Sequence, residues 1–294
     1  MEERLFLIGV LVPACCALAM AVVALRHRAR WMGISLAMAL AISSFNQQGG
    51  LTWPRPGEWT WLALSLITAS ICAAVGGHDA GSRAARGIVC SIAACVACVL
   101  LPLPGWADAI SRLALAAAAA AGAACLLPLG TRRGGFSIWT CWSIAIAAPS
   151  VVALSCGFAK LAMALGAVSA TCGTLAALAL FTRHAWPAGM SGSIVIALTC
   201  VLGAAVAHAF DSLNTPGWVF VVAGAAPLGA WLGEAPPFRR TTLVSALARL
   251  VGVGIIAGLA TWAVAPRLAS DGESDAYALA HVPCRVQIEP RSSR

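Results

Sequence analysis

The densest group of polar side chains in this strongly apolar sequence closes an apolar run between Gly203 and Trp218. It consists of His208, Asp211 and Asn214. His208 and Asp211 are three residues apart, so on a continuous helix they share a face and could pair. A neighbouring carboxylate favours the protonated form of an imidazole. The group could therefore bind a small polar solute, or its members could be solvated helix caps and loop residues at a membrane exit.

A second polar group, three consecutive amides, ends the second apolar run of the chain. If both groups lie at the same membrane face, the amides would complete a polar pocket that opens outward. This hypothesis defines six candidate solute-binding residues: Asn46, Gln47, Gln48, His208, Asp211 and Asn214.

The elements that must position these residues are membrane helices. Hydrophobic residues make up 60% of the 294 and charged residues only 10%, with a mean hydropathy of +0.87. Soluble domains carry about 25% charged residues, so lipid must cover most of this surface. The net charge of +8 comes from arginines between apolar runs, where they set membrane orientation and do not indicate nucleic-acid binding. The expected partner is the lipid bilayer, with a homo-oligomer or membrane-complex partner as a further possibility.

The apolar runs predict an all-α polytopic integral membrane protein, a bundle of about ten transmembrane helices, with nine to eleven allowed by the pattern. Residues 1–265 form the multi-pass domain. Pro266 is expected to stop the last helix, leaving 266–294 as a polar C-terminal tail with little order. The predicted spans are Leu5 to Leu25, Trp31 to Phe45, Trp59 to Val75, Ile88 to Leu103, Leu113 to Leu129, Phe136 to Cys156, Leu161 to Phe181, Ser191 to Phe210, Trp218 to Leu232 and Leu243 to Ala265.

Basic residues alternate between the loops that connect these spans. With ten crossings, ten arginines fall on one side, which the positive-inside rule makes cytoplasmic. Both termini then lie outside a bacterial-type inner membrane. The ten are Arg26, Arg28, Arg30, Arg83, Arg86, Arg132, Arg133, Arg183, Arg239 and Arg240.

Three features predict how the helices pack. The unbroken alanines from Ala116 to Ala121 permit close backbone approach and favour a helix inside the bundle. Gly254 and Gly258 match the small-xxx-small pattern of a helix contact face. Arg249 lies about two turns into the last span, where it could snorkel to the interface or take a buried role.

Two motifs with catalytic spacing are better explained by packing. Gly189-Met190-Ser191-Gly192 resembles the Gly-x-Ser-Gly of rhomboid-type intramembrane proteases over four residues. The available base, His208, would lie about 25 Å away on the same helix, so we expect Ser191 to cap that helix. Cys95-x-x-Cys98 lies within an apolar run without an acidic or His partner, and buried thiols stay protonated.

These patterns leave three classes of function. A transporter or permease for a small polar solute rests on the span count and the two polar groups. A non-catalytic membrane subunit or scaffold rests on the small-residue faces. An intramembrane enzyme has the least support, because no acid, base and nucleophile converge, and no cofactor or metal site is expected. A hydrated cavity between the second and eighth spans would favour the transporter, and a closed dry bundle the scaffold.

Overall fold

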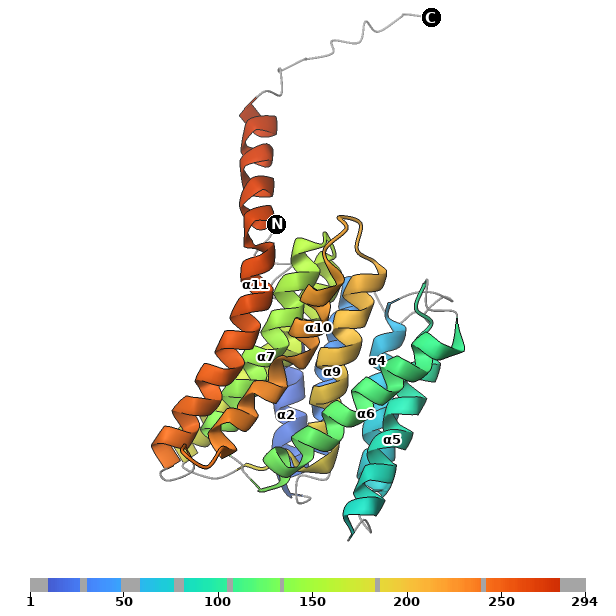
Figure 1. Ribbon diagram of the computed structural model, residues 1–294, viewed down its shortest axis with the longest axis vertical. Coiled ribbons are helices and arrows are strands. Elements are labelled where there is room, and N and C mark those ends of the chain that lie inside the picture. The colour runs from blue at the N-terminus through green and yellow to red at the C-terminus, as the bar shows by residue number, and fades with distance from the viewer. Residues whose placement is uncertain are drawn as a thin grey trace, which may run out of the picture.

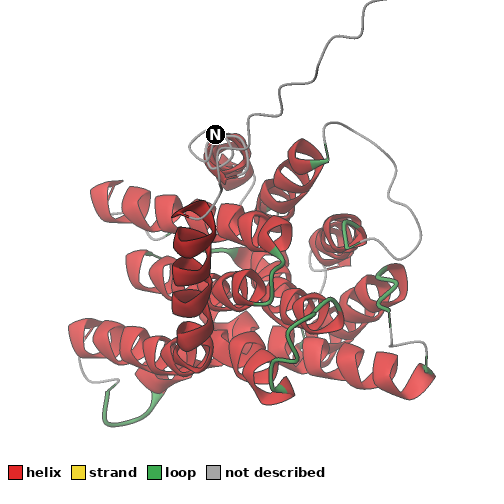
Figure 2. Cartoon of the chain, turned by 90° about the horizontal axis from the view of Figure 1, so that it is seen from above, coloured by secondary structure: helices red, strands yellow, loops and turns green. Residues whose placement is uncertain are grey.

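The computed structural model describes residues 10–26, 31–48, 59–76, 82–104, 108–132, 135–182, 186–238 and 242–280, with the backbone alone at 24–26, 132 and 267–280. These residues form a bundle of helices joined by short loops, without strands (Figures 1 and 2). The elements are α2 (Val12–Arg26), α3 (Met32–Gln47), α4 (Trp61–Gly76), α5 (Arg83–Leu100), α6 (Ala109–Arg132), α7 (Phe136–Ser155), α8 (Ala159–Thr182), α9 (Gly189–Ala209), α10 (Gly217–Ala225), the 3-10 helix η2 (Ala226–Glu234) and α11 (Thr242–Ala280).

The protein is an all-helical, multi-pass membrane protein. Seven helices of the described chain, counting α10 and η2 together, are long and apolar enough to cross a bilayer. The other three, α2, α3 and α4, have 15, 16 and 16 residues. Sixteen residues rise about 24 Å, less than the ~30 Å of hydrocarbon in a typical bilayer. Each predicted span overlaps helical structure, although residues 5–9 of the first span lie outside the described part of the chain and the ninth span comprises α10 and η2. Ten crossings stays a prediction.

Local sequence explains where two of the helices begin. The Ser82 side chain accepts from the backbone N–H of Ala85 at 3.0 Å and caps α5. The Asp108 carboxylate accepts from the N–H of Ser111 at 2.8 Å at the start of α6. Such caps satisfy N–H groups that have no partner within the helix.

Helix α9 lies at the centre of the bundle (Figure 1), and 16 of its 21 residues are buried. A helix that is apolar all round must be covered on every side. Its small residues permit close approach: a Cβ on Gly203 would lie 3.0 Å from a methyl group of Leu165 in α8. At its N-terminus, a Cβ on Gly33 of α3 would lie 2.6 Å from the carbonyl oxygen of Ser191. Helix α9 is therefore packed backbone to backbone against α3 and in close side-chain contact with α8.

Hydroxyl groups join α7 to α8 within the apolar bundle. Ser143 donates to the carbonyl of Ser169 at 2.9 Å, and Ser169 donates back to the carbonyl of Ser143 at 2.8 Å. About two helical turns further along, Ser150 donates to the carbonyl of Ala162 at 2.7 Å. Interhelical hydrogen bonds of this kind replace the hydrophobic driving force that lipid removes.

Two predictions about the last helix are wrong. Helix α11 continues through Pro266 to Ala280 and projects beyond the bundle (Figure 1). A proline costs a helix about 3 kcal/mol, which is tolerated where water or other groups can bind the freed carbonyl. The second error concerns the contact face: Gly254 and Gly258 are exposed, and a Cβ on either would meet nothing within 4 Å. The contact is made by Gly252 instead.

The prediction for the alanine run of α6 is only half right. Ala116 and Ala119 are buried, whereas Ala117 and Ala118 are exposed. Helix α6 thus packs with one face and leaves the other open, and this open face becomes important for the site.

Candidate functional site

The loop from Phe210 to Pro216 joins α9 to α10 and contains two of the predicted site residues. The Asp211 carboxylate accepts from the backbone N–H of Leu213 at 3.0 Å and from the N–H of Thr215. Partial burial raises the pKa of Asp211, but these hydrogen bonds, with those from the Thr215 hydroxyl and the Cys156 thiol, outweigh it and lower the pKa below its ordinary value. Asp211 therefore organises its own loop.

The same loop is tied to the turn between α7 and α8. The Thr215 hydroxyl lies 3.5 Å from the sulfur of Cys156, and Ser212 donates to the carbonyl of Cys156 at 3.5 Å. Asn214 is exposed and has a φ of 53°, a left-handed conformation that Asn adopts more readily than most residues. Asn214 therefore forms part of the turn between α9 and α10.

His208 faces a different set of neighbours. Its ring lies 4.8 Å from that of Phe220 in α10, at an interplanar angle of 43°. The hydrogen bonds of the Asp211 carboxylate go to its own loop and to Cys156. The hypothesis that His208 and Asp211 pair is therefore not supported by this geometry: the two side chains have separate partners.

The amides at the end of α3 lie in another environment. Gln47 donates through Nε2 to the Ser43 hydroxyl at 2.9 Å, and its Oε1 is buried without a hydrogen-bond partner. Asn46 is exposed and Gln48 partly buried. None of the three lines the cavity that His208 borders. The amides of α3 therefore do not contribute to this cavity, and the combined polar pocket stays a prediction.

The cavity beside His208 is an apolar groove of about 620 Å³. Residues of α6 and of α10 with η2 line its sides, and residues of α9, which contacts both α6 and α10, line its base. It opens on the outer surface of the bundle, since Val221 is 71% exposed. His208 is the only lining residue that can carry a positive charge, and none is acidic. The lining residues are Ala114, Leu115, Ala118, Ala121, Gly122, Cys125, Leu126, Ala197, Val201, Ala204, Ala205, His208, Gly217, Phe220, Val221, Gly224, Ala225, Pro227 and Leu228. We call this cavity the α6–α10 groove.

A buried ion pair stands where α7, η2 and α11 meet. Arg249 is 6% exposed. Its NH2 lies 2.5 Å from Glu234 Oε1, and its NH1 donates to the Ser137 hydroxyl at 3.2 Å. The structure therefore gives Arg249 the buried role, not the snorkelling one, because a carboxylate and a hydroxyl are within reach inside the bundle.

The predicted cap by Ser191 is wrong, and its geometry also argues against a nucleophile. Ser191 is 1% exposed, and its hydroxyl accepts a hydrogen bond from the N–H of Gly33 at 3.1 Å. Ala188 occupies the N-cap of α9. Ser191 thus satisfies a free N–H in the first turn of α3. Within the described residues, no three His, Cys, Asp or Glu side chains gather as metal ligands would, and the eleven cysteines there are free.

Fold and site together define a multi-pass helical membrane protein with an apolar groove on the outer surface of its helix bundle. The chain matches no protein-family model and no curated protein. Of the six predicted residues, His208 alone lines the groove. Sequence reasoning missed the other lining residues because they are Ala, Gly, Val and Leu, which are typical of any membrane helix. Only the alanine-rich α6 carried a signal, and packing inside the bundle explained it equally well.

Proposed function

We propose that this protein binds an amphiphilic lipid molecule, drawn from the surrounding bilayer, in the α6–α10 groove. The observation that carries the proposal is the groove itself: about 620 Å³ of apolar space, open to the lipid side, with His208 as its one strongly polar side chain. An acyl or isoprenoid chain suits such a lining because it leaves no polar group unsatisfied.

The dimensions of the groove agree with a single lipid chain. Its residues on α6 run from Ala114 to Leu126, about 18 Å at 1.5 Å per residue. One leaflet of a ~30 Å hydrocarbon core is about 15 Å deep. His208 ends α9 beside the loop to α10, where a polar headgroup would meet it. The groove is therefore about one leaflet long, with its polar residue at the membrane surface.

The proposed ligand is an amphiphilic lipid, whereas the sequence predicted a small polar solute as the substrate of a transporter. A small polar solute would need several convergent polar groups, and the groove offers one. The buried, unpaired Oε1 of Gln47 favours a polar ligand near α3, but a single acceptor does not form a pocket. A transporter role would mean that the bound amphiphile moves between leaflets. A scaffold role would mean that another chain covers the groove, and an intramembrane enzyme has no converging catalytic groups among the described residues.

The test is photo-crosslinking in vesicles with a phosphatidylcholine whose acyl chain carries a diazirine. We expect label on the α6 and α10 peptides that line the groove. Ala118 is exposed and lines the groove, so Ala118→Phe fills it and should reduce that label about tenfold, equivalent to ~1.4 kcal/mol.

Ala117→Phe provides a matched control, since Ala117 is the neighbouring exposed alanine and lies outside the groove. It should leave the label unchanged. Equal labelling of wild type and Ala118→Phe would refute the proposal. No label on the groove peptides of the wild-type protein would support the scaffold instead, because another chain would then cover the groove.

A further inference from the structure

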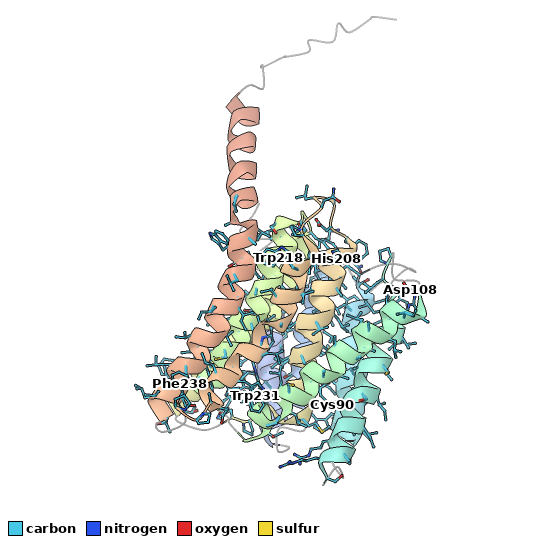
Figure 3. The ribbon with its side chains drawn as sticks, in the orientation of Figure 1. Cys90, Asp108, His208, Trp218, Trp231 and Phe238 are labelled. Carbon is cyan, nitrogen blue, oxygen red and sulfur yellow. The ribbon has the colours of Figure 1, made fainter. Side chains whose placement is uncertain are left out.

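Trp231 joins η2 to α6 at one end of the α6–α10 groove. Its indole Nε1 donates to the backbone carbonyl of Cys125 at 2.9 Å, and Cys125 lines the groove. Trp231 follows the groove residue Leu228 by three positions. Residues i and i+3 eclipse in a 3-10 helix, so the indole of Trp231 lies on the same face of η2 as Leu228. His208 and Trp231 lie toward opposite ends of the bundle (Figure 3). The indole thus lies beside Cys125, just beyond the lining residues, at the end of the groove away from His208.

Helix η2 is an unusually long 3-10 helix, and contacts with α11 stabilise this conformation. Its nine residues form a 3-10 helix, although 3-10 runs beyond three or four residues are uncommon. A Cβ on Gly229 would lie 2.5 Å from the carbonyl carbon of Gly252, so the two backbones touch. Ser245 donates to the carbonyl of Gly233 at 2.8 Å. The Glu234–Arg249 ion pair fixes the last residue of η2.

The winding of η2 decides where the indole lies. A 3-10 helix turns 120° per residue and an α-helix 100°. Over the three residues from Leu228 to Trp231, α-helical winding would turn the indole about 60° away from the face of η2 that carries Leu228. It would also shorten the rise between the two residues by about 1.5 Å. The contacts from α11 therefore keep Trp231 at the end of the groove.

We infer that Trp231 determines the greatest length of apolar chain that the groove accepts. This inference rests on the proposed function. An aromatic side chain that closes an apolar slot excludes a longer chain by steric clash, and one additional methylene in a hydrophobic pocket changes binding by about tenfold or more. Trp231 is a specificity-determining residue, and Arg249 and Glu234 are positioning residues that act through η2.

The experiment uses vesicles with photo-reactive phosphatidylcholines that differ only in the length of the labelled chain. Wild-type protein should show label on α6 up to a limiting length and a sharp fall beyond it. Trp231→Ala should extend this limit by roughly two to four carbons and raise the label from such chains about tenfold. Trp231→Leu retains an apolar side chain for folding and should shift the limit less, in the same direction.

Leu228→Phe adds volume within the groove and should shorten the limit. Trp262→Ala is the control, since Trp262 is 74% exposed on α11, a helix that contributes no residue to the groove lining, and should leave the limit unchanged. A limit that is identical in wild type and in every folded Trp231 variant would overturn the inference. Absence of groove label in wild type at all lengths would instead overturn the proposed function, so the two failures are distinguishable.

Discussion

Asp211 illustrates how one side chain can stabilise a loop through hydrogen bonds to its backbone. Its carboxylate accepts from the N–H groups of Leu213 and Thr215. We predict that Asp211→Ala destabilises the protein by about 1 kcal/mol, a fall of roughly 2 °C in the melting temperature measured in detergent at pH 7. Asp211→Asn keeps one acceptor oxygen and should lose less. Asn214→Ala, which removes no hydrogen bond from the carboxylate, tests whether any change in this loop has the same effect.

The pH dependence follows from the lowered pKa of Asp211. A depressed pKa in the folded state stabilises the protein above the ordinary Asp value of about 3.9, and this contribution is lost as the pH falls through the folded pKa. The difference in melting temperature between wild type and Asp211→Ala should therefore be constant near neutrality and shrink below about pH 4. A difference that grows toward acid pH would contradict this account.

At the residue scale, the sequence predicted which positions are unusual but not what they contact. His208 was predicted as a site residue and does border the groove. Its partner is Phe220, twelve residues further along the chain, not the nearby Asp211. Arg249 pairs with Glu234 across a loop. Such contacts depend on how helices pack, which the local spacing of polar residues does not contain.

At the scale of elements, the contact between η2 and α11 offers a sharp test of packing. A Cβ on Gly229 would lie 2.5 Å from backbone atoms of Gly252, and neither backbone can move aside without separating the two elements. We predict that Gly229→Ala lowers the melting temperature in detergent by several degrees, equivalent to about 1–3 kcal/mol for overpacking. Gly254→Ala meets nothing within 4 Å and should be neutral or slightly stabilising, since Ala is the better helix former. Equal effects of the two substitutions would contradict the contact.

The helices themselves could be predicted from the sequence, often to within a few residues. The span predicted from Phe136 to Cys156 is α7, Phe136–Ser155. The winding of η2 and the buried face of α11 could not be predicted in the same way. Uniformly apolar helices in lipid lack the polar face that reveals orientation in a soluble protein. In α11 the choice between Gly252 and Gly254 is decided by the position of Gly229, which only the packed structure gives.

At the scale of the whole molecule, contacts at the two ends of the bundle show which helices run in the same direction. At one end the start of α3 meets the start of α9, and Trp139 near the start of α7 donates to the carbonyl of Trp186 at 2.8 Å. At the other end the ring of Phe158 lies 5.6 Å from that of Trp59 and 5.3 Å from that of Phe210. Helices α3, α7 and α9 therefore run in the same direction, as the alternation of basic loops predicts.

This arrangement gives a test of one of the three short crossings, that of the 16-residue helix α4. We predict that cysteines introduced at Asn46 and at Ser82, on either side of α4, are labelled from opposite sides. In a protein otherwise depleted of cysteine, a membrane-impermeant maleimide should label Asn46→Cys in intact cells. It should label Ser82→Cys only after permeabilisation, because Arg83 and Arg86 favour the cytoplasmic side.

Asn214→Cys, in the loop after the longer α9, is the control for an outside position. Labelling of Asn46→Cys and Ser82→Cys from the same side would mean that α4 does not cross. The membrane would then have to thin, or helices to tilt, around a bundle of fewer spans.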